Sequence, residues 1–407
     1  MATKLRIYAS IHTGIQYISL FLDAVEKNVH YDIIICGGGA SGLLLANALV
    51  NDSAFDELSI AIIEKEAKNT NDRTWSFWEK GDGMWDDIVH KQWAKGVFRA
   101  KNFQKTFPFH PYRYKTIRSK ILYATIHKRL QKANNITQIQ AHIDTIIPEK
   151  EQCRVTTSQS TYTGSRVFSS IPTQSFRNQQ KYPVLQQHFI GWFVKTDSPI
   201  FDPNVVDFMD FDLPQKNNTR FMYVLPFSTN EALVEYTLFS RDLLEKSEYE
   251  QAIIDYLEKK KVEKYTIEEK EQGNIPMTAY DFTQHNTAHL MHIGTAGGWT
   301  KASTGFTLQK SLARIASLIP FLKTNQPLDR FNQRSRFEFF DLLFLDVLDK
   351  YNGEGHLLFR RMFEQNPPAR IFNFLEEKTR WWQEFMLMKT FPIGRFLTAL
   401  IKRLFAL

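Results

Sequence analysis

Cysteine is scarce in this chain: its 407 residues include only Cys36 and Cys153, which form neither a CxxC pair nor a disulfide framework. Such usage is typical of a reducing compartment. Long apolar runs are missing too, because no window holds about eighteen uninterrupted apolar residues, so we expect no membrane-spanning helix. No lysine- or arginine-rich block accompanies the net charge of +7, which argues against nucleic-acid binding. A diffuse basic excess suits an anionic membrane surface better.

Two common kinds of catalytic site also lack their signatures. No cluster of His, Cys, Asp and Glu has metal-ligand spacing, and the nucleophile motif GxSxG is missing. Aromatic residues are abundant at 14%, with 33 phenylalanines. That supply suits either a large aromatic core or a long apolar cavity lined with rings. The chain is long enough for two or three domains.

A nucleotide-binding pattern opens the readable part of the chain. Residues 31–36, "YDIIIC", predict a buried parallel strand, and Gly37, Gly39 and Gly42 follow it in the spacing GxGxxG. These glycines permit a tight turn, close backbone approach to a pyrophosphate and close packing of the next helix. A second strand ends at Glu64, which is placed to accept hydrogen bonds from a ribose. No second GxGxxG appears, so we expect one dinucleotide.

A distant segment, residues 291–319, is typical of a chain that returns to such a site. Gly294, Gly297 and Gly298 lie in a loop of small residues between a short strand and a helix expected from about Thr307. Flavoproteins of the hydroxylase type usually carry Gly-Asp at the end of this strand. Here Thr295 follows Gly294, which argues against an ordinary monooxygenase.

Four blocks in order resemble the flavin-dependent lycopene cyclases of bacteria and plants. The resemblance implies an α/β fold (α+β overall), with a Rossmann-like FAD-binding domain of the hydroxylase/reductase type, a strand-rich substrate domain and a helical C-terminal region. The blocks are "GGGASGLLLA", "NDRTWSFWE" at 71–79, "FMDFD" to "VEYTLFS" within 208–240, and "GNIPMTAY" at 273–280 followed by "GTAGGWTKASTGFTL".

The activity implied by this resemblance is that of an isomerase (an intramolecular lyase), a lycopene β-cyclase. A proton adds to the terminal alkene of lycopene, the neighbouring double bond closes on the tertiary cation, and a ring proton leaves, which gives γ-carotene and then β-carotene. Such chemistry needs a protonated acid in a dry site, support for the cation, and exclusion of water. The resemblance also implies FAD in its reduced form without net redox, with NAD(P)H as a candidate reductant.

Glu235 in "ALVEYT" is the candidate acid. Desolvation among apolar neighbours would favour its neutral, proton-donating form, although an alternating strand with Glu235 in solvent is the alternative. It matches the first Glu of the family's acidic block, whose second position is Tyr236 here. The more literal match "FLEEKT" at 374–379 lies in a charge-rich helical tail, and we interpret it as a solvated helix face.

Four further residues are weaker candidates. Asp210 either takes part in catalysis or holds a turn. Trp75, Phe77 and Trp299 either face the cation or pack in the core.

The domain ranges follow from these blocks. We expect an N-terminal extension of uncertain status at 1–30, the FAD-binding domain at 31–105 plus 270–330, a substrate domain at 106–269, and a helical region at 331–407. In 393–407 apolar residues recur at helical spacing, with Arg395, Lys402 and Arg403 elsewhere and no acid within the segment. This pattern predicts a membrane-surface helix, with a helix that caps the core as the alternative.

A lipid-soluble substrate favours the membrane interpretation, and therefore a peripheral protein on the cytoplasmic side. Protein partners are not predicted. Two other functions stay open: a flavin-dependent reductase or epoxidase acting on an isoprenoid, and a non-catalytic apolar carrier.

Overall fold

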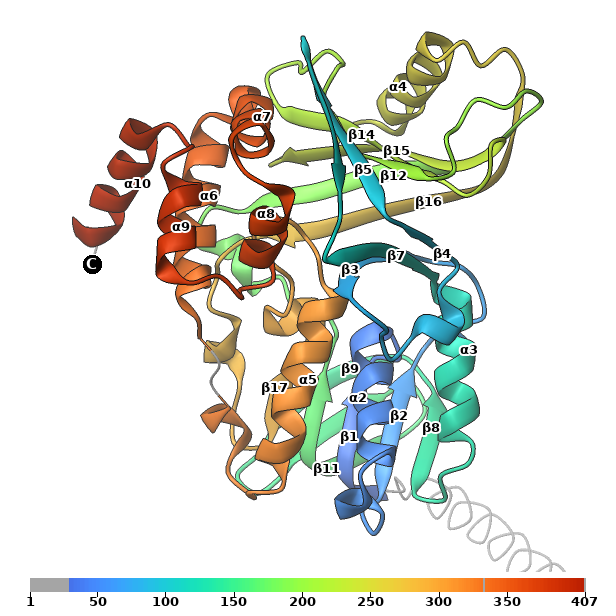
Figure 1. Cartoon of the computed structure of the whole chain (residues 1–407). Helices are drawn as coiled ribbons and strands as arrows, with labels where there is room; N and C mark the ends of the chain where they lie inside the picture. The colour runs from blue at the N-terminus through green and yellow to red at the C-terminus, as the bar shows by residue number, and fades with distance from the viewer. Residues whose placement is uncertain (1–28, 332–333, 406–407) are drawn as a thin grey trace, which may run out of the picture.

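The nucleotide-binding pattern forms the centre of a seven-stranded sheet. Figure 1 shows the computed structural model, which describes residues 29–331 and 334–405. Strand β1 (Val29–Cys36) pairs in parallel with β2 (Ile60–Glu64) and β11 (Thr161–Ser169). Its apolar, β-branched run is buried because the strand lies inside the sheet and helices cover one face. The predicted order of strand, glycines, helix, strand and acid is therefore confirmed.

This first sheet has the order β8-β2-β1-β11-β10-β9, and β17 pairs with β11. The return segment thus comes back beside the strand next to β1, as predicted. Helix α5 follows β17 and lies along α2, where the hydroxyls of Ser41 and Ser311 are 3.2 Å apart. The remaining bounds are β8 Ile136–Gln140, β9 Ile143–Pro148, β10 Cys153–Thr157, β17 Leu290–His292, α2 Ala40–Val50, α3 Ser119–Leu130 and α5 Leu308–Leu322.

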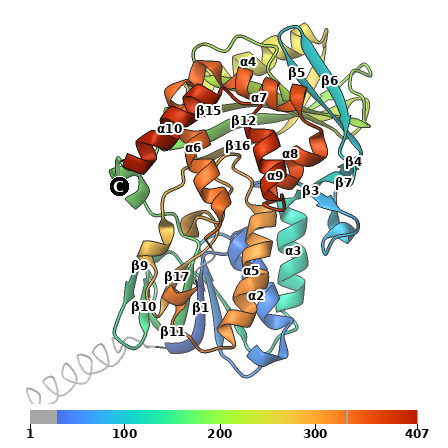
Figure 2. The same cartoon turned by 60° about the vertical axis from the view of Figure 1, so that its left-hand side comes forward.

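A second seven-stranded sheet lies above the first in Figure 1 and carries most of the strand-rich part of the chain. Helix α4 packs on one of its faces, and the C-terminal helices approach the opposite side (Figure 2). The order is β16 (Tyr265–Met277), β12 (Leu185–Thr196), β15 (Glu231–Ser240), β14 (Thr219–Pro226), β13 (Val205–Asp210), β5 (Lys95–Ala100) and β6 (Phe103–Pro108), with α4 at Lys246–Lys259.

A three-stranded sheet lies between the two large sheets, and the C-terminal helices pack beside the second sheet (Figure 2). In the small sheet β7 lies between β3 and β4. The elements are β3 Thr74–Lys80, β4 Lys91–Trp93, β7 Tyr112–Arg118, α6 Arg336–Lys350, α7 Gly355–Gln365, α8 Pro368–Leu375, α9 Trp381–Met388 and α10 Ile393–Phe405. Among the described residues, no helix is long and apolar enough to cross a membrane.

The sheets divide the chain differently from the predicted domain ranges. Residues 136–169 were expected in the substrate domain, but they form four strands of the nucleotide sheet. Conversely, β5, residues 103–105 of β6 and residues 270–277 of β16 were expected in the FAD-binding domain, but they belong to the second sheet. The chain crosses between the sheets several times, and short alternating strands do not reveal which sheet will receive them. The helical C-terminal region is confirmed over 336–405, whereas the predicted extension, apart from residues 29 and 30, lies outside the described residues.

Gly42 generates the first prediction, because a Cβ atom there would lie 2.0 Å from the carbonyl oxygen of Gly37. Gly42→Ala should lower the free energy of unfolding by roughly 1–3 kcal/mol, since helix α2 must move away from the turn. Urea denaturation measures the change. Gly39→Ala is the matched control, because its Cβ would meet no described atom within 4 Å. Equal losses in both variants would contradict the account.

Candidate active site

The amino end of α2 fits a phosphate group. Its N-cap residue, Gly39, provides no side-chain hydrogen bond to the first turn, and that turn contains no acid. A Cβ at Gly39 would project into a space with no described atom within 4 Å, so the packing of the protein itself does not explain the glycine. Free backbone N–H groups at a helix amino end are suited to an anion. Gly37, with φ +100°, makes the turn that leads to them.

Glu64 ends β2 beside this turn, as predicted. One carboxylate oxygen accepts a hydrogen bond from the backbone N–H of Gly38 at 2.6 Å, and the other accepts from the N–H of Glu66 at 3.0 Å. The carboxylate is therefore fixed at the carboxyl end of the strand, where a ribose would be recognised in a nucleotide-binding unit of this type.

The return loop closes over the amino end of α2. Gly294 has φ +60°, and a Cβ there would lie 2.5 Å from the hydroxyl oxygen of Ser41, so glycine is required on both counts. Gly297 and Gly298 follow in the same loop, which then leads to α5. The three predicted glycines of this segment and those of the first turn are thus brought together.

A cavity of about 620 Å³ runs from this loop to the C-terminal helices. It is lined mainly by aromatic and aliphatic side chains of the second sheet, of residues 303–308 and of helices α6 to α10. A small group of polar side chains interrupts the apolar wall near β3, β7, β14 and β15. This group is Ser76, Tyr114, Tyr223, Glu235 and Thr237.

Glu235 lies in the wall of this cavity and is 7% exposed. Burial raises its pKa to about 8, the charge of Glu271 adds to the increase, and the hydrogen bond that Thr237 donates at 2.5 Å opposes it. The expectation of a desolvated carboxyl that stays neutral at neutral pH is consistent with these contacts. Tyr223 is the direct partner of Glu235 across the β14–β15 pair, and its hydroxyl lies 2.6 Å from that of Tyr114.

Asp210 does not line the cavity, although its neighbours Phe208 and Met209 do. Its carboxylate accepts a hydrogen bond from the hydroxyl of Tyr256 on α4 at 3.1 Å and one from the backbone N–H of Asp212 at 3.0 Å. These contacts agree with the alternative role in holding a turn, and a catalytic role for Asp210 stays a prediction.

Of the three aromatic residues predicted to face the cation, one lines the cavity and two do not. Trp75 lines the cavity, so the structure keeps it as a candidate. Phe77 is packed in the core between the first sheet and its helices, and Trp299 shares that core. Neither lines the cavity, so their positions agree with the alternative of packing in the core, and a cation-facing role stays a prediction for both.

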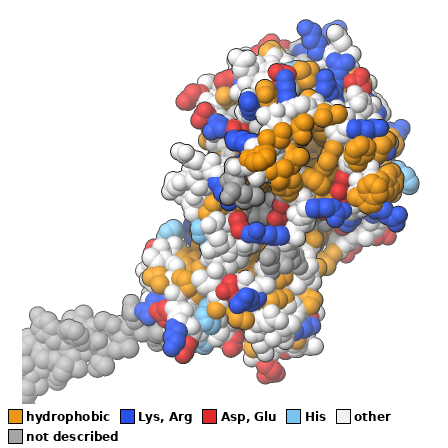
Figure 3. Space-filling model, turned by 90° about the vertical axis from the view of Figure 1, so that its left-hand side faces the viewer, with side chains coloured by type: hydrophobic (Ala, Val, Ile, Leu, Met, Phe, Trp, Pro, Cys, Tyr) orange, Lys and Arg blue, Asp and Glu red, His pale blue; other side chains and the backbone are white. Residues whose placement is uncertain are grey.

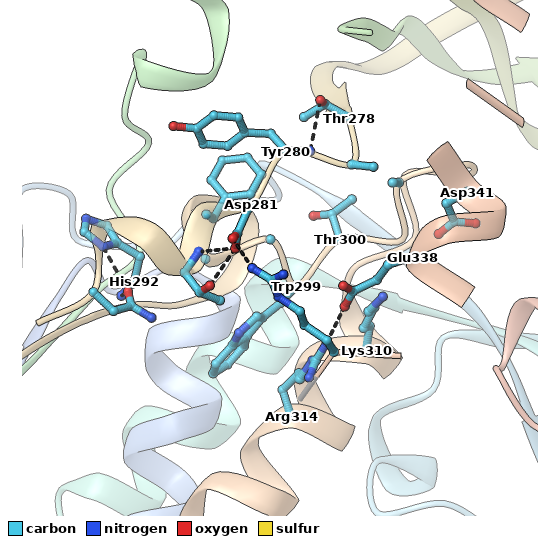
Figure 4. Close-up of a pocket in the computed structure, with 18 of the residues that line it drawn as sticks. Thr278, Tyr280, Asp281, His292, Trp299, Thr300, Lys310, Arg314, Glu338 and Asp341 are labelled. Carbon is cyan, nitrogen blue, oxygen red and sulfur yellow. Dashed lines mark hydrogen bonds and ion pairs between the residues drawn. The ribbon is translucent and has the colours of Figure 1, made fainter. Parts of the chain in front are cut away.

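Trp299 also borders a smaller, charged pocket of about 140 Å³ (Figure 4). Charged side chains of this pocket form pairs with one another, including Arg314 with Glu338 at 3.2 Å. In the part of the chain that the structure describes, no group of three His, Cys, Asp or Glu side chains could hold a metal ion.

The segment "FLEEKT" is not a solvated helix face. Glu377 lies in the turn after α8 and pairs with Lys301 at 3.4 Å and Lys310 at 3.0 Å. Burial opposes ionisation of Glu377, but the two lysines outweigh it and lower its pKa to about 2. Lys301, buried in the return loop, also pairs with Asp341 of α6 at 2.8 Å. These ion pairs connect the return loop with the C-terminal helices.

Glu271 and the two tyrosines are functional candidates that the sequence did not reveal. Glu271 is buried, but its strand carries so many charged residues that the sequence predicts a solvent-exposed side chain. The sequence offered one sign of its importance: Glu271 lies two residues before the block "GNIPMTAY", which carries part of the family resemblance. Tyr114 and Tyr223 come from strands more than a hundred residues apart, so only the fold brings them together.

Comparison with known proteins identifies the family. The model of the family described as lycopene cyclase protein matches residues 32–400. The chain belongs to this family. The lycopene beta-cyclase of Pantoea ananas is 26% identical over 297 residues, which cover 70% of this chain and 72% of that protein. The enzyme of the same name from Pseudescherichia vulneris is 25% identical over 294 residues, with 69% and 72% covered.

Solved structures show that this chain shares the fold of flavoproteins. A geranylgeranyl bacteriochlorophyll reductase-like protein from Thermoplasma acidophilum aligns with a TM-score of 0.56 at 12% identity, covering 91% of this chain and 96% of that one. Halogenase PltM in complex with phloroglucinol and FAD aligns with a TM-score of 0.53 at 12% identity, covering 88% and 82%. The predicted hydroxylase/reductase type of fold is confirmed.

The position of Glu235 generates a prediction about stability. The folded protein keeps the proton of Glu235 up to about pH 8, whereas the unfolded chain loses it near 4.5. Between these values the unfolded state binds fewer protons, so the free energy of unfolding falls as pH rises, by about 1.4 kcal/mol per pH unit for a full proton. Glu235→Gln lacks this titration.

Urea denaturation between about pH 5 and about pH 8 measures the difference. We expect a shallower fall for the variant, which should be more stable than the unchanged protein at the alkaline end. Parallel pH dependences in the two proteins would show that Glu235 ionises normally in the fold.

Proposed function

We propose that this protein is a lycopene β-cyclase, an isomerase that closes β-rings at the ends of lycopene to give γ-carotene and β-carotene. The observation that carries the proposal is the buried carboxyl of Glu235 in the wall of a long apolar cavity, in a member of the lycopene cyclase family. An elongated hydrocarbon fits such a wall, and a neutral carboxyl is the form that donates a proton.

FAD is the cofactor that we propose for the nucleotide site. The uncapped amino end of α2, the open side of Gly39 and the fixed carboxylate of Glu64 suit its pyrophosphate and ribose. When bound in its reduced form, FAD supplies electron density that stabilises a nearby cation without net redox. NAD(P)H is our proposed source of its electrons, and we assign it no site.

The residues of the chain then share the work. Glu235 donates its proton to the terminal alkene. The rings of Trp75, Tyr114 and Tyr223 line the same cavity and can stabilise the cation through their faces. The apolar wall excludes water, which would otherwise trap the cation as an alcohol. One proton enters and one ring proton leaves, so the product is an isomer of the substrate.

Incubation of lycopene with the flavin-reduced, anaerobic protein in heavy water tests this function. Each new ring should carry deuterium, and Glu235→Gln should lower the rate by at least about a hundredfold, the usual contribution of a general acid. Mass spectrometry of the product decides the result.

The same incubation in ordinary water separates the alternatives, because the cyclic product then has the mass of lycopene. A reductase or an epoxidase changes the product by two hydrogens or one oxygen, and a carrier returns lycopene unchanged. Unlabelled rings, or full activity of Glu235→Gln, would remove Glu235 as the proton donor.

We further propose that helices α9 and α10 lie on a membrane, which makes this a peripheral protein of the cytoplasmic side. Figure 3 shows hydrophobic side chains gathered around a hollow on this face, with Lys and Arg around them. Trp381 of α9 is 77% exposed, and Ile401 and Leu404 of α10 are about half exposed. Phe385 and Leu397 are exposed and also line the cavity, so a hydrocarbon could enter from the lipid.

Two basic residues of α10 have acidic partners outside the segment, which the sequence did not predict. Arg395 pairs with Glu354 at 2.8 Å and Arg403 pairs with Asp346 at 2.5 Å, so two of the three cations have acidic partners supplied by distant segments. Apolar contact is therefore the main attraction that we propose for this surface.

The double variant Ile401→Glu, Leu404→Glu tests the membrane surface. It should lose most of its sedimentation with phospholipid vesicles, since two charges replace apolar side chains that would enter the lipid. Ile121→Glu is the matched control, because Ile121 is 42% exposed and belongs to α3, which lies on the opposite side of Figure 1 from α9 and α10. Equal sedimentation of all three proteins would contradict the proposed surface.

A further inference from the structure

A row of cross-strand partners crosses one face of the second sheet at Glu235. Tyr223 of β14 pairs with Glu235 of β15, Glu235 pairs with Gly191 of β12, and Gly191 pairs with Glu271 of β16. Directly opposed residues of neighbouring strands present their side chains on the same side of a sheet. Glu235 and Glu271 therefore share a face, separated by one strand.

Gly191 leaves the space between the two acids free of a side chain. A Cβ atom there would lie 3.4 Å from Cγ of Glu271 and 3.5 Å from Cβ of Glu235. It would also lie 2.8 Å from a methyl group of Leu233. Any other residue at this position would thus place its side chain between the two acids, whereas glycine leaves no side chain to separate the charge of Glu271 from Glu235.

Thr74 holds Glu271 by a hydrogen bond, and the charges of two arginines lie close enough to act on it. The hydroxyl of Thr74 donates a hydrogen bond to its carboxylate at 2.7 Å, and Thr74 begins the strand that continues into the cavity wall. Burial raises the pKa of Glu271 and the charge of Glu269 adds to the increase, whereas Thr74, Arg118 and Arg73 oppose part of it. Glu235 has no arginine among the groups that shift its pKa, so Glu271 is the member of the pair that ionises first.

We propose that Glu271 is a positioning residue for ring closure: its carboxylate, fixed by Thr74 across Gly191, keeps the neighbouring carboxyl of Glu235 protonated and ready to donate. This inference rests on the proposed function, because it gives Glu235 the role of proton donor. It also supplies from β16 the second acid that the chain lacks at Tyr236, whose side chain packs on the opposite face with Arg220.

No other charged or titratable group described near the pair supplies the negative charge that Glu271 places beside Glu235. Tyr223 and Tyr114 stay neutral, because burial raises the pKa of both hydroxyls. Arg118 is shared with Glu269 at 2.5 Å. The remaining charged groups that line the cavity are Arg73, Lys389 and Asp341, and Asp341 pairs with Lys301.

Glu271→Gln tests the inference, because glutamine keeps the size and can still accept the hydrogen bond from Thr74 but carries no charge. The first readout is the infrared carboxyl band of Glu235, identified by its loss in Glu235→Gln and followed against pH in the protein without substrate. Its midpoint should move from about 8 to lower pH by roughly one unit. The alkaline limb of kcat for lycopene should move with it.

Two further variants separate charge from structure. Glu271→Asp keeps the charge and should keep most of the high midpoint, and it serves also if Glu271→Gln fails to fold. Glu268→Gln is the matched control on the exposed face of the same strand, and it should behave as the unchanged protein.

The two claims fail in distinguishable ways. If Glu271→Gln leaves the Glu235 midpoint near 8, or if Glu271→Asp loses it to the same extent as Glu271→Gln, the positioning role is wrong. If the midpoint moves as expected but the unchanged, flavin-reduced protein forms no cyclic product, the proposed function is wrong instead.

Discussion

Burial of the Glu235 carboxyl is the constraint on which the rest of the site depends. A carboxyl in water would be ionised at neutral pH and could not protonate an alkene. The apolar cavity wall reverses that preference, and the same wall excludes the water that would intercept a cation. One physical condition, a low-dielectric cavity with the Glu235 carboxyl in its wall beside two tyrosines, therefore serves both the protonation step and the protection of the cation in the reaction that we propose.

The architecture maintains this condition from several directions. The second sheet supplies Glu235, the small sheet supplies Tyr114, and the C-terminal helices complete the wall. These helices are tied to the return loop by the buried pair of Lys301 and Asp341 together with Glu377. Removing one partner of such a network leaves an uncompensated buried charge, which is strongly destabilising. These ion pairs therefore fix the return loop against the helices that line the cavity. The acid, the cofactor loop and the apolar face thus belong to one assembly.

Local patterns in the sequence predicted the parts whose physics is local. The strand before Gly37, the packing of Gly42 and the end of β2 at Glu64 follow from short-range requirements, and the family resemblance selected Glu235. Features that depend on long-range pairing were missed. The sheet membership of residues 136–169, the buried position of Asp210 against α4, the ion pairs of Glu377 and the approach of Glu271 across Gly191 are set by contacts between distant segments. A charged strand such as β16 gives no local sign that one of its acids is buried.

The central claim is that the fold holds Glu235 as a neutral acid at neutral pH. Carbon-13 NMR of the protein labelled at its glutamate carboxyl carbons measures this directly, with the signal of Glu235 assigned by its absence in Glu235→Gln. We expect a protonated carboxyl at neutral pH that titrates with a midpoint of about 8. A Glu235 carboxyl that is ionised at neutral pH, with a titration midpoint near the ordinary value of 4.5, would contradict a neutral acid at this position.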